Sequence, residues 1–184
     1  MIRSKIFASL LFSLFFFSSY TQGKFYTKTG TITFFSSTAI EDIEAVNKAA
    51  VSILDTQTGD IQFAVLMKGF EFKKALMQEH FNRDYAESNQ FPKSEFKGIV
   101  SNNNDINYKK HGTYPAKVKG KLTIHGQTKE IEATGSIMVA EEKISLHSSF
   151  NILLSDYNIK IQKIHRNNIS GSIKITVDCS LEPL

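Results

Sequence analysis

The stretch "KGKLTIHGQTKEIEATGSIMV", Lys119–Val139, contains two runs of alternating apolar and polar residues on either side of a short turn. In the first run, Gly120, Leu122 and Ile124 share one side, and polar residues share the other. Successive side chains of a β-strand point to opposite faces, so each run predicts a strand with one apolar and one solvated face. The stretch therefore predicts a β-hairpin.

The turn of this hairpin contains His125, which is either a catalytic or metal-binding group or simply the corner of the hairpin. Gly126 supplies backbone freedom for a tight turn, and we expect the imidazole to form a local hydrogen bond. Glu79-His80 could meet His125 in space, but no two histidines have the two- to four-residue spacing of common metal sites. We therefore interpret His125 as a hairpin corner and expect no metal site; the other histidines are His80, His111, His147 and His165.

The same alternation recurs along the chain and predicts an all-β fold. Fifteen Phe and six Tyr, with three Pro and no Trp, favour half-buried strands. About eight strands are expected: Gly30–Phe35, Lys48–Leu54, Asp60–Phe70, Phe96–Val100, Tyr114–Ile124, Ile131–Val139, Ile144–Ile152 and Ile169–Leu181.

Clear helical spacing is confined to residues 72–81, where Phe72, Leu76, Met77 and His80 or Phe81 fall on one side. This pattern predicts one short helix, which we expect to cover one opening of the fold. A brief helical turn is possible over 40–46. The Asn- and Lys-rich segment 101–112 predicts a solvated loop.

Long antiparallel strands with one apolar side favour closure, because an open sheet leaves unpaired edges. An up-and-down barrel of about eight strands satisfies this, and its interior is either filled by side chains or holds one small ligand. Small residues among the inward positions fit either a solid core or an apolar cavity: Ala116, Gly120, Ala133, Gly135, Ser148 and Gly171. If a cavity exists, we expect it to be lined by Ile32, Phe34, Phe63, Val65, Phe96, Val118, Leu122, Ile137, Leu146, Phe150, Ile152 and Ile175.

The N-terminus begins with a short basic region, followed by apolar residues from Ile6 to Phe17 and then by polar residues. This order is typical of a secretory signal peptide, which we place at residues 1–21, with the barrel domain at 22–184. A retained membrane anchor is the alternative, but it needs about 20 apolar residues. The expected location is therefore the periplasm or the exterior. The single Cys179 lies in an alternating run and fits a buried hydrophobe better than a nucleophile.

Charge and motifs exclude several function classes. A formal net charge of +4 is too small to imply nucleic acid. No Gly-x-Ser-x-Gly elbow or phosphate-binding Gly-rich loop is present, and candidate carboxylate pairs such as Glu130 and Glu132 alternate with apolar residues on a solvated face. We therefore predict no catalytic residues and no enzyme. A lysine stripe at 117, 119 and 121 is either a soluble outer face or a surface for transient membrane contact.

Several stretches resemble the YceI-like proteins, a family of secreted lipocalin-like barrels associated with polyisoprenoid lipids. The matching stretches are "GTITFFSS", "TGDIQFAVLMKGFEF", "ALMQEHFNRDYAESNQFPKSEFKG", "VKGKLTIHGQTKEIE", "FNILLSDYNIK" and "ISGSIKITVDCSLE". The resemblance extends over roughly Gly23–Leu181. It departs at Lys160–His165, where family members often have a proline.

The resemblance implies a barrel that holds a long isoprenoid chain, either an isoprenoid lipid or a quinone, without catalysis as a general property. Combined with the apolar inward faces, it predicts a periplasmic or secreted lipid-binding protein whose partner is a long-chain isoprenoid lipid. The alternative is a non-catalytic stress-response or protein-interaction module with a filled barrel. The pattern does not indicate the oligomeric state, the chain length or the head group.

Overall fold

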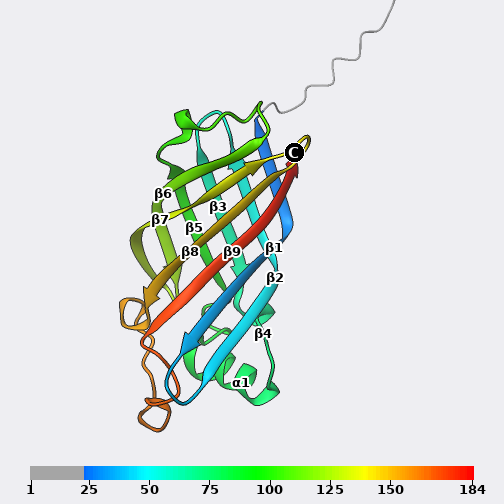
Figure 1. Ribbon diagram of the computed structural model, residues 1–184. Helices are drawn as coiled ribbons and strands as arrows, with labels where there is room; N and C mark the ends of the chain where they lie inside the picture. The colour runs from blue at the N-terminus through cyan, green and yellow to red at the C-terminus, as the bar shows by residue number, and fades with distance from the viewer. Residues whose placement is uncertain (1–22) are drawn as a thin grey trace, which may run out of the picture.

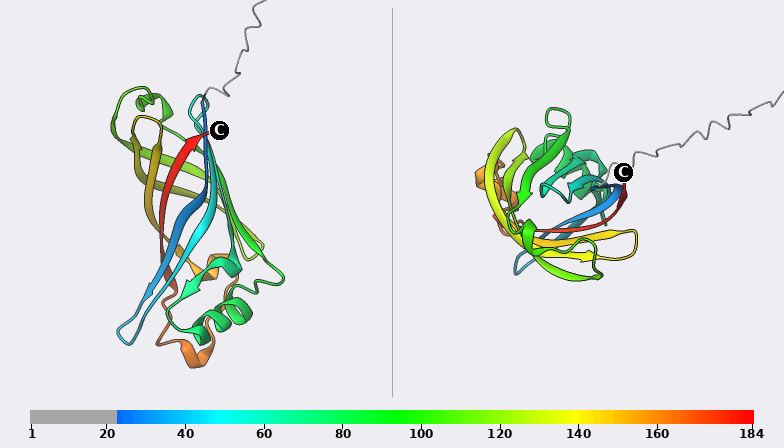
Figure 2. Two further views of the ribbon diagram at one scale, coloured as in Figure 1. Left: turned by 90° about the vertical axis from the view of Figure 1, so that its right-hand side faces the viewer. Right: turned by 90° about the horizontal axis from the view of Figure 1, so that it is seen from above.

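The computed structural model describes residues 23–184 and shows a closed antiparallel β-barrel (Figure 1). Within these residues, eight strands form the ring in the order β1-β9-β8-β7-β6-β5-β3-β2, and β2 pairs with β1 to close it. The view from above shows the strands surrounding the barrel axis (Figure 2). The prediction of an all-β up-and-down barrel with one short helix is confirmed. The predicted signal peptide, residues 1–21, lies outside the described residues.

Strands of 7 to 14 residues form the ring, and short helical turns connect several of them. The strands are β1 (Lys24–Ser37), β2 (Asp42–Asp55), β3 (Asp60–Leu66), β4 (Glu71–Phe72), β5 (Lys93–Val100), β6 (Gly112–Ile124), β7 (Gln127–Val139), β8 (Ile144–Leu153) and β9 (Ser172–Pro183). The helix α1 (Ala75–His80) continues into the π-helical turn η2 (Phe81–Tyr85). The 3-10 turns are η1 (Met67–Gly69), η3 (Asn103–Asp105), η4 (Leu154–Tyr157) and η5 (Lys163–His165).

The hairpin predicted from residues 119–139 is β6–β7, and its turn is His125-Gly126. Both turn residues have left-handed backbones, with φ of 51° and 71°, as a two-residue turn between twisted strands requires. The expectation of a local imidazole bond was wrong. His125 Nδ1 lies 3.1 Å from the Tyr157 carbonyl oxygen and Nε2 lies 2.8 Å from Glu87 Oε2, so the side chain connects this corner to two distant loops.

The N-terminal half differs from the prediction in two boundaries. The possible helical turn over 40–46 was wrong, because β2 begins at Asp42 and pairs with β1 along its whole length. The strand expected over 60–70 ends at Leu66. Beyond it the backbone of Gly69 passes the Asn47 side chain so closely that a Cβ there would lie 2.6 Å from Asn47 Nδ2. Asn47 in turn donates to the Leu66 carbonyl oxygen at 3.0 Å, which fixes the end of the strand.

Two further predictions are corrected by tertiary contacts. The helix begins at Ala75 rather than at residue 72, because Phe72 belongs to β4 and pairs with Ala45 of β2. The loop 101–112 is not solvated throughout. Ile106 is buried and Tyr108 packs on the barrel core, so this loop covers one end of the barrel.

The two ends of the barrel are built differently. The closed end is the end at which β6 begins and β5 finishes, where Leu54, Val100, Ile144 and Leu181 are almost completely buried. The open end is the opposite one, where β5 begins and β8 finishes. There α1 and the segment between β8 and β9 lie beyond the strand ends (Figures 1 and 2). The expected helical cover is therefore at the open end.

Candidate ligand-binding cavity

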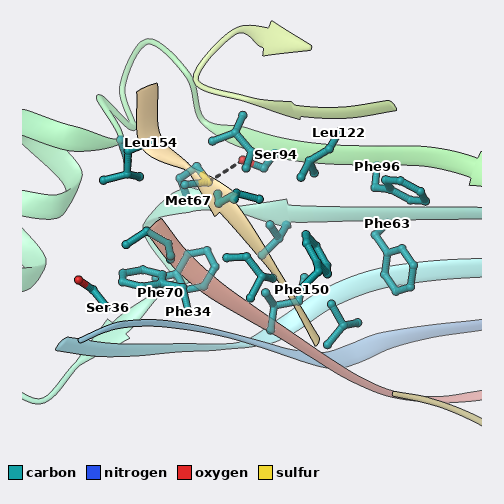
Figure 3. Close-up of a pocket in the computed structure, with 18 of the residues that line it drawn as sticks. Phe34, Ser36, Phe63, Met67, Phe70, Ser94, Phe96, Leu122, Phe150 and Leu154 are labelled. Carbon is teal, nitrogen blue, oxygen red and sulfur yellow. Dashed lines mark hydrogen bonds between the residues drawn. The ribbon is translucent and has the colours of Figure 1, made fainter. Parts of the chain in front are cut away.

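The interior contains a cavity of about 550 Å³ that extends inward from the open end (Figure 3). Residues of all nine described strands contribute to its walls, together with α1 and the turns η1, η2, η4 and η5. Leu76 of α1 lines the cavity and is 64% exposed, so the cavity reaches solvent at this end. A volume of this size lies within the ~300–1,000 Å³ range of small-molecule sites. The barrel is therefore filled at one end and hollow at the other.

All twelve residues predicted to line a cavity lie in its wall, while their contact with a ligand stays a prediction. Several of them face inward yet remain partly accessible, as expected for side chains that border empty space rather than packed atoms. The strands place them as follows: Ile32 and Phe34 on β1, Phe63 and Val65 on β3, Phe96 on β5, Val118 and Leu122 on β6, Ile137 on β7, Leu146, Phe150 and Ile152 on β8, and Ile175 on β9.

The sequence interpretation missed a cluster of four phenylalanines at the open end. Phe34 lies 5.3 to 5.4 Å, between ring centroids, from each of the other three, and Phe72 lies 5.1 Å from Phe81. Tilted and edge-on rings at these separations attract one another beyond simple area burial. Phe70 and Phe72 follow β3, and Phe81 is the first residue of η2, directly after α1. The cluster therefore attaches the helix to the barrel and forms an apolar entrance.

Small inward residues have two different roles. Ala116, Ala133, Gly135 and Ser148 line the cavity, so their size leaves room in it. Gly120 instead pairs with Gly98 beneath an aromatic ring, and a Cβ at either glycine would lie 2.6 to 2.7 Å from Phe96 Cζ. Gly171 does not line the cavity. Some of the small inward residues therefore make room for a cavity, and others allow neighbouring groups to pack closely.

Inside the cavity wall, one polar group is satisfied within the protein. Ser94 Oγ donates to Met67 Sδ at 3.0 Å, as Figure 3 shows, and both residues are buried. Met67 thereby hides a hydroxyl that would otherwise face an apolar ligand. The deep part of the cavity wall is consequently mostly apolar, although Ser136, His147 and Ser148 also line it, and a larger set of polar side chains lies at the open end.

Polar residues around the open end form two linked groups. In the first, the Glu41 carboxylate accepts from Lys74 Nζ at 3.1 Å and from Asn168 Nδ2 at 3.2 Å, and these bonds lower its pKa. In the second, the Tyr85 hydroxyl lies 2.6 Å from His165 Nδ1. Burial raises the pKa of Tyr85, so the phenol stays neutral. All five residues line the cavity and connect α1, η2 and the β8–β9 segment.

An acidic group next to the second set is neutralised by its neighbours. Arg83 holds Asp84 through two bonds of 2.7 and 2.8 Å, and His80 Nδ1 lies 2.8 Å from the same carboxylate. These bonds hold the pKa of Asp84 well below its usual range. His80 lines the cavity and its ring lies 5.8 Å from that of His165. Of these residues, His80 therefore borders the cavity, while Arg83 and Asp84 satisfy one another outside its wall.

The possibility that His80 meets His125 is not realised, since His80 contacts Asp84 and His165. Within residues 23–184, no three His, Cys, Asp or Glu side chains lie close enough together to hold a metal ion. The same residues contain no helix that is long and apolar enough to span a membrane. Cys179 is buried, and this burial raises the pKa of its thiol to about 12, aided by nearby Asp178.

The model of the YceI-like domain matches residues 5–181 of this chain. The chain belongs to the YceI-like family. No curated protein sequence matches the chain. Membership agrees with the closed barrel and the apolar interior described above, and this fold supports lipid binding.

Three solved structures share the fold at low sequence identity. A polyisoprenoid-binding domain from Saccharophagus degradans, implicated in plant cell wall breakdown, aligns with a TM-score of 0.77 at 13% identity, over 88% of this chain and 99% of that one. BcnA of Burkholderia cenocepacia gives 0.68 at 14%, over 83% and 95%. The YceI protein of Campylobacter jejuni gives 0.54 at 18%, over 72% and 78%. These similarities establish the barrel architecture.

Proposed function

We propose that this protein is a periplasmic or secreted carrier that holds the long apolar chain of a polyisoprenoid-type lipid inside its barrel. The observation that supports this most directly is the apolar cavity, closed at one end and reaching solvent at the other. The naming of the Saccharophagus degradans domain as polyisoprenoid-binding supports the ligand class. A quinone with an isoprenoid tail fits the same description.

The shape of the cavity favours a long, narrow ligand over a compact one. Its lining follows β6 from Ala116 to Ile124, which corresponds to about 26 Å of strand. Burial of apolar surface at roughly 25 cal/mol per Å² drives capture of such a chain without any specific contact. Binding then depends on the shape of the cavity and not on covalent chemistry by the protein.

The polar groups at the open end would contact the head group of this ligand. Lys74, Tyr85 and His165 all line the cavity and come from three different segments. A lipid that enters with its chain first leaves its head group beside them. The open end therefore selects the head group, while the cavity wall accepts any apolar chain of suitable width.

Organic extraction of the purified protein followed by mass spectrometry tests the proposal. We expect a prenyl species at about one molecule per chain. Absence of any lipid, from protein prepared without detergent in the presence of membranes, would favour the filled-barrel interaction module. Conversion of added prenyl lipid to a new product would instead indicate an enzyme.

The proposed location rests on the basic, apolar and polar order of the first 21 residues. N-terminal sequencing of the protein recovered from the extracytoplasmic fraction should give a start near Gln22. Recovery of chains that retain Met1 would contradict the proposed processing.

A further inference from the structure

The four most exposed large apolar side chains of residues 23–184 all lie at the open end. Ile164 is 78% exposed, Ile40 and Leu66 are each 65% exposed, and Leu76 is 64% exposed. The remaining exposed large apolar residues are only 39% to 53% accessible, and most of them lie along the barrel wall or at the closed end. Single surface apolar residues need no explanation, but a concentration around one opening indicates an interaction surface.

Three of these side chains come from segments that are bonded to one another. Ile40 precedes Glu41, whose carboxylate binds Lys74 beside Leu76 on α1 and Asn168 on the β8–β9 segment. Ile164 precedes His165, which binds Tyr85 of η2. The β1–β2 turn, α1 and the β8–β9 segment therefore meet around the cavity entrance. The left view of Figure 2 shows all three at the same end of the barrel.

The β8–β9 segment also has uncompensated positive charge. Residues 159–170 contain three cations and no Asp or Glu, and no ion pair within the described residues involves any of the three. Four acidic side chains around the same opening are, in contrast, already paired with Lys73, Lys74 or Arg83. The three exposed cations are Lys160, Lys163 and Arg166.

We propose that the open end docks on the surface of an anionic phospholipid bilayer. Ile40, Leu76 and Ile164 enter the boundary between head groups and acyl chains, and the cations of residues 159–170 face the anionic head groups. Apolar insertion combined with basic residues is how peripheral proteins bind such surfaces. An acidic protein partner would use the same charges, but it would not require apolar side chains exposed on three separate segments around a lipid-sized entrance.

The purpose of docking rests on the proposed lipid carriage. Leu76 both lines the cavity and protrudes from the rim, so docking places the entrance directly on the bilayer. A long apolar chain then passes between bilayer and barrel without exposure to water, which removes the main barrier to transfer. Surface binding itself, however, does not depend on a ligand in the cavity.

Co-sedimentation with lipid vesicles tests the surface directly. Residues 22–184 contain every strand of the closed barrel and exclude the apolar N-terminal stretch, which would bind vesicles by itself. Vesicles of phosphatidylcholine with one quarter phosphatidylglycerol are compared with pure phosphatidylcholine at physiological ionic strength. We expect binding to the anionic vesicles. Ile164→Ser combined with Leu76→Ser should weaken it about tenfold or more, and Lys163→Gln with Arg166→Gln about fivefold per charge removed.

Matched controls replace residues of the barrel wall. Ile99→Ser with Met138→Ser removes two exposed apolar side chains, and Lys117→Gln with Lys121→Gln removes two outer charges; both pairs should leave binding unchanged. Wild-type protein that stays in the supernatant, or controls that weaken binding as much as the open-end variants, would overturn the proposal. Lipid content after extraction distinguishes the docking proposal from the carriage proposal. A protein that contains lipid but does not bind vesicles refutes docking alone. A protein that binds vesicles but contains no lipid refutes carriage alone.

Discussion

The same eight strands build a solid core at one end of the barrel and a cavity at the other. At the closed end, inward residues such as Leu54 and Leu181 are fully buried, and the loop after β5 inserts Ile106 above them. At the open end, inward residues such as Phe34 and Phe150 remain partly accessible because they face empty space. The difference teaches that strand pattern sets the barrel, while the loops and side-chain sizes at each end decide whether it can hold a ligand.

The largest expected effect is a difference between truncations at the two ends. Leu54→Ala removes a side chain that is packed on all sides, so we expect it to lower the free energy of unfolding by about 2–5 kcal/mol. Leu122→Ala removes a side chain that already borders the cavity, and we expect it to cost roughly half as much, since fewer packed contacts are lost. Denaturant unfolding of the delipidated proteins measures both, and equal losses would break the comparison.

Added bulk should show the same contrast, with the larger loss of stability at a packed position and the smaller one at the cavity wall. Ala50→Leu adds volume at a fully buried position outside the cavity wall, and we expect it to cost about 1–3 kcal/mol. Ala133→Phe adds volume into the cavity, so it should cost less than this while excluding the ligand. Thermal melting of delipidated samples and lipid extraction are the measurements. The delipidated reference is needed because bound ligand raises the melting temperature by mass action. An Ala133→Phe protein that retains its lipid would contradict the assigned cavity.

Raising the pH into the alkaline range should lower the free energy of unfolding through ionisable groups that are buried away from the open end. Burial raises the pKa of Cys179 from 9.0 to about 12 and that of Tyr108 from 10.0 to about 12. Both groups bind their protons more tightly in the folded chain, so their contribution is fully present below pH 9 and is lost as pH rises toward 12. Cys179→Ala should reduce this slope by up to about 1.4 kcal/mol per pH unit. Unfolding curves collected across this range would show an unchanged slope if the thiol were accessible.

The smallest expected effect on ligand content is that of His125→Ala. His125 binds Glu87 and the Tyr157 carbonyl oxygen, and none of these three residues lines the cavity. The variant should therefore lose some stability, about 1–3 kcal/mol, while its extracted lipid per folded chain stays at the wild-type level. A parallel metal assay should show no zinc dependence. Loss of both lipid and zinc would show that the histidine serves a metal site.

Alternation predicted most strands and every lining residue named from the sequence, because the two-residue period of a strand does not depend on its partners. It failed at the start of β2, where the inward residues are Ala45, Asn47 and Ala50. Small and polar inward residues produce no hydrophobic alternation, so the segment looked helical. Phe72 caused the second error in the helix prediction. Its spacing to Leu76 matches a helix by coincidence, but its backbone is extended because it pairs with β2.

Alternation left open the choice between a cavity and a solid core, and it gave no sign of the polar network around the entrance. Gly120 and Ala133 are both small residues at inward-facing positions of the alternating pattern. Gly120 nevertheless packs against an aromatic ring, whereas Ala133 borders the cavity. Only the three-dimensional packing separates these outcomes. The hydrogen bond between Glu41 and Asn168 joins residues 127 positions apart, and the one between Tyr85 and His165 joins residues 80 positions apart. No local sequence pattern predicts contacts over such separations.

The first and last strands bring both termini of the described chain to the closed end (Figure 1). Leu184 N donates to the Lys24 carbonyl oxygen at 2.9 Å, and Thr56 N donates to that of Gly23 at 2.7 Å, so both ends are fastened beside one another. A fusion partner, affinity tag or solid support attached directly before Gly23 or after Leu184 is therefore held away from the cavity entrance. The protein can be immobilised in one orientation, with its entrance directed outward, for capture of apolar molecules from a flowing sample.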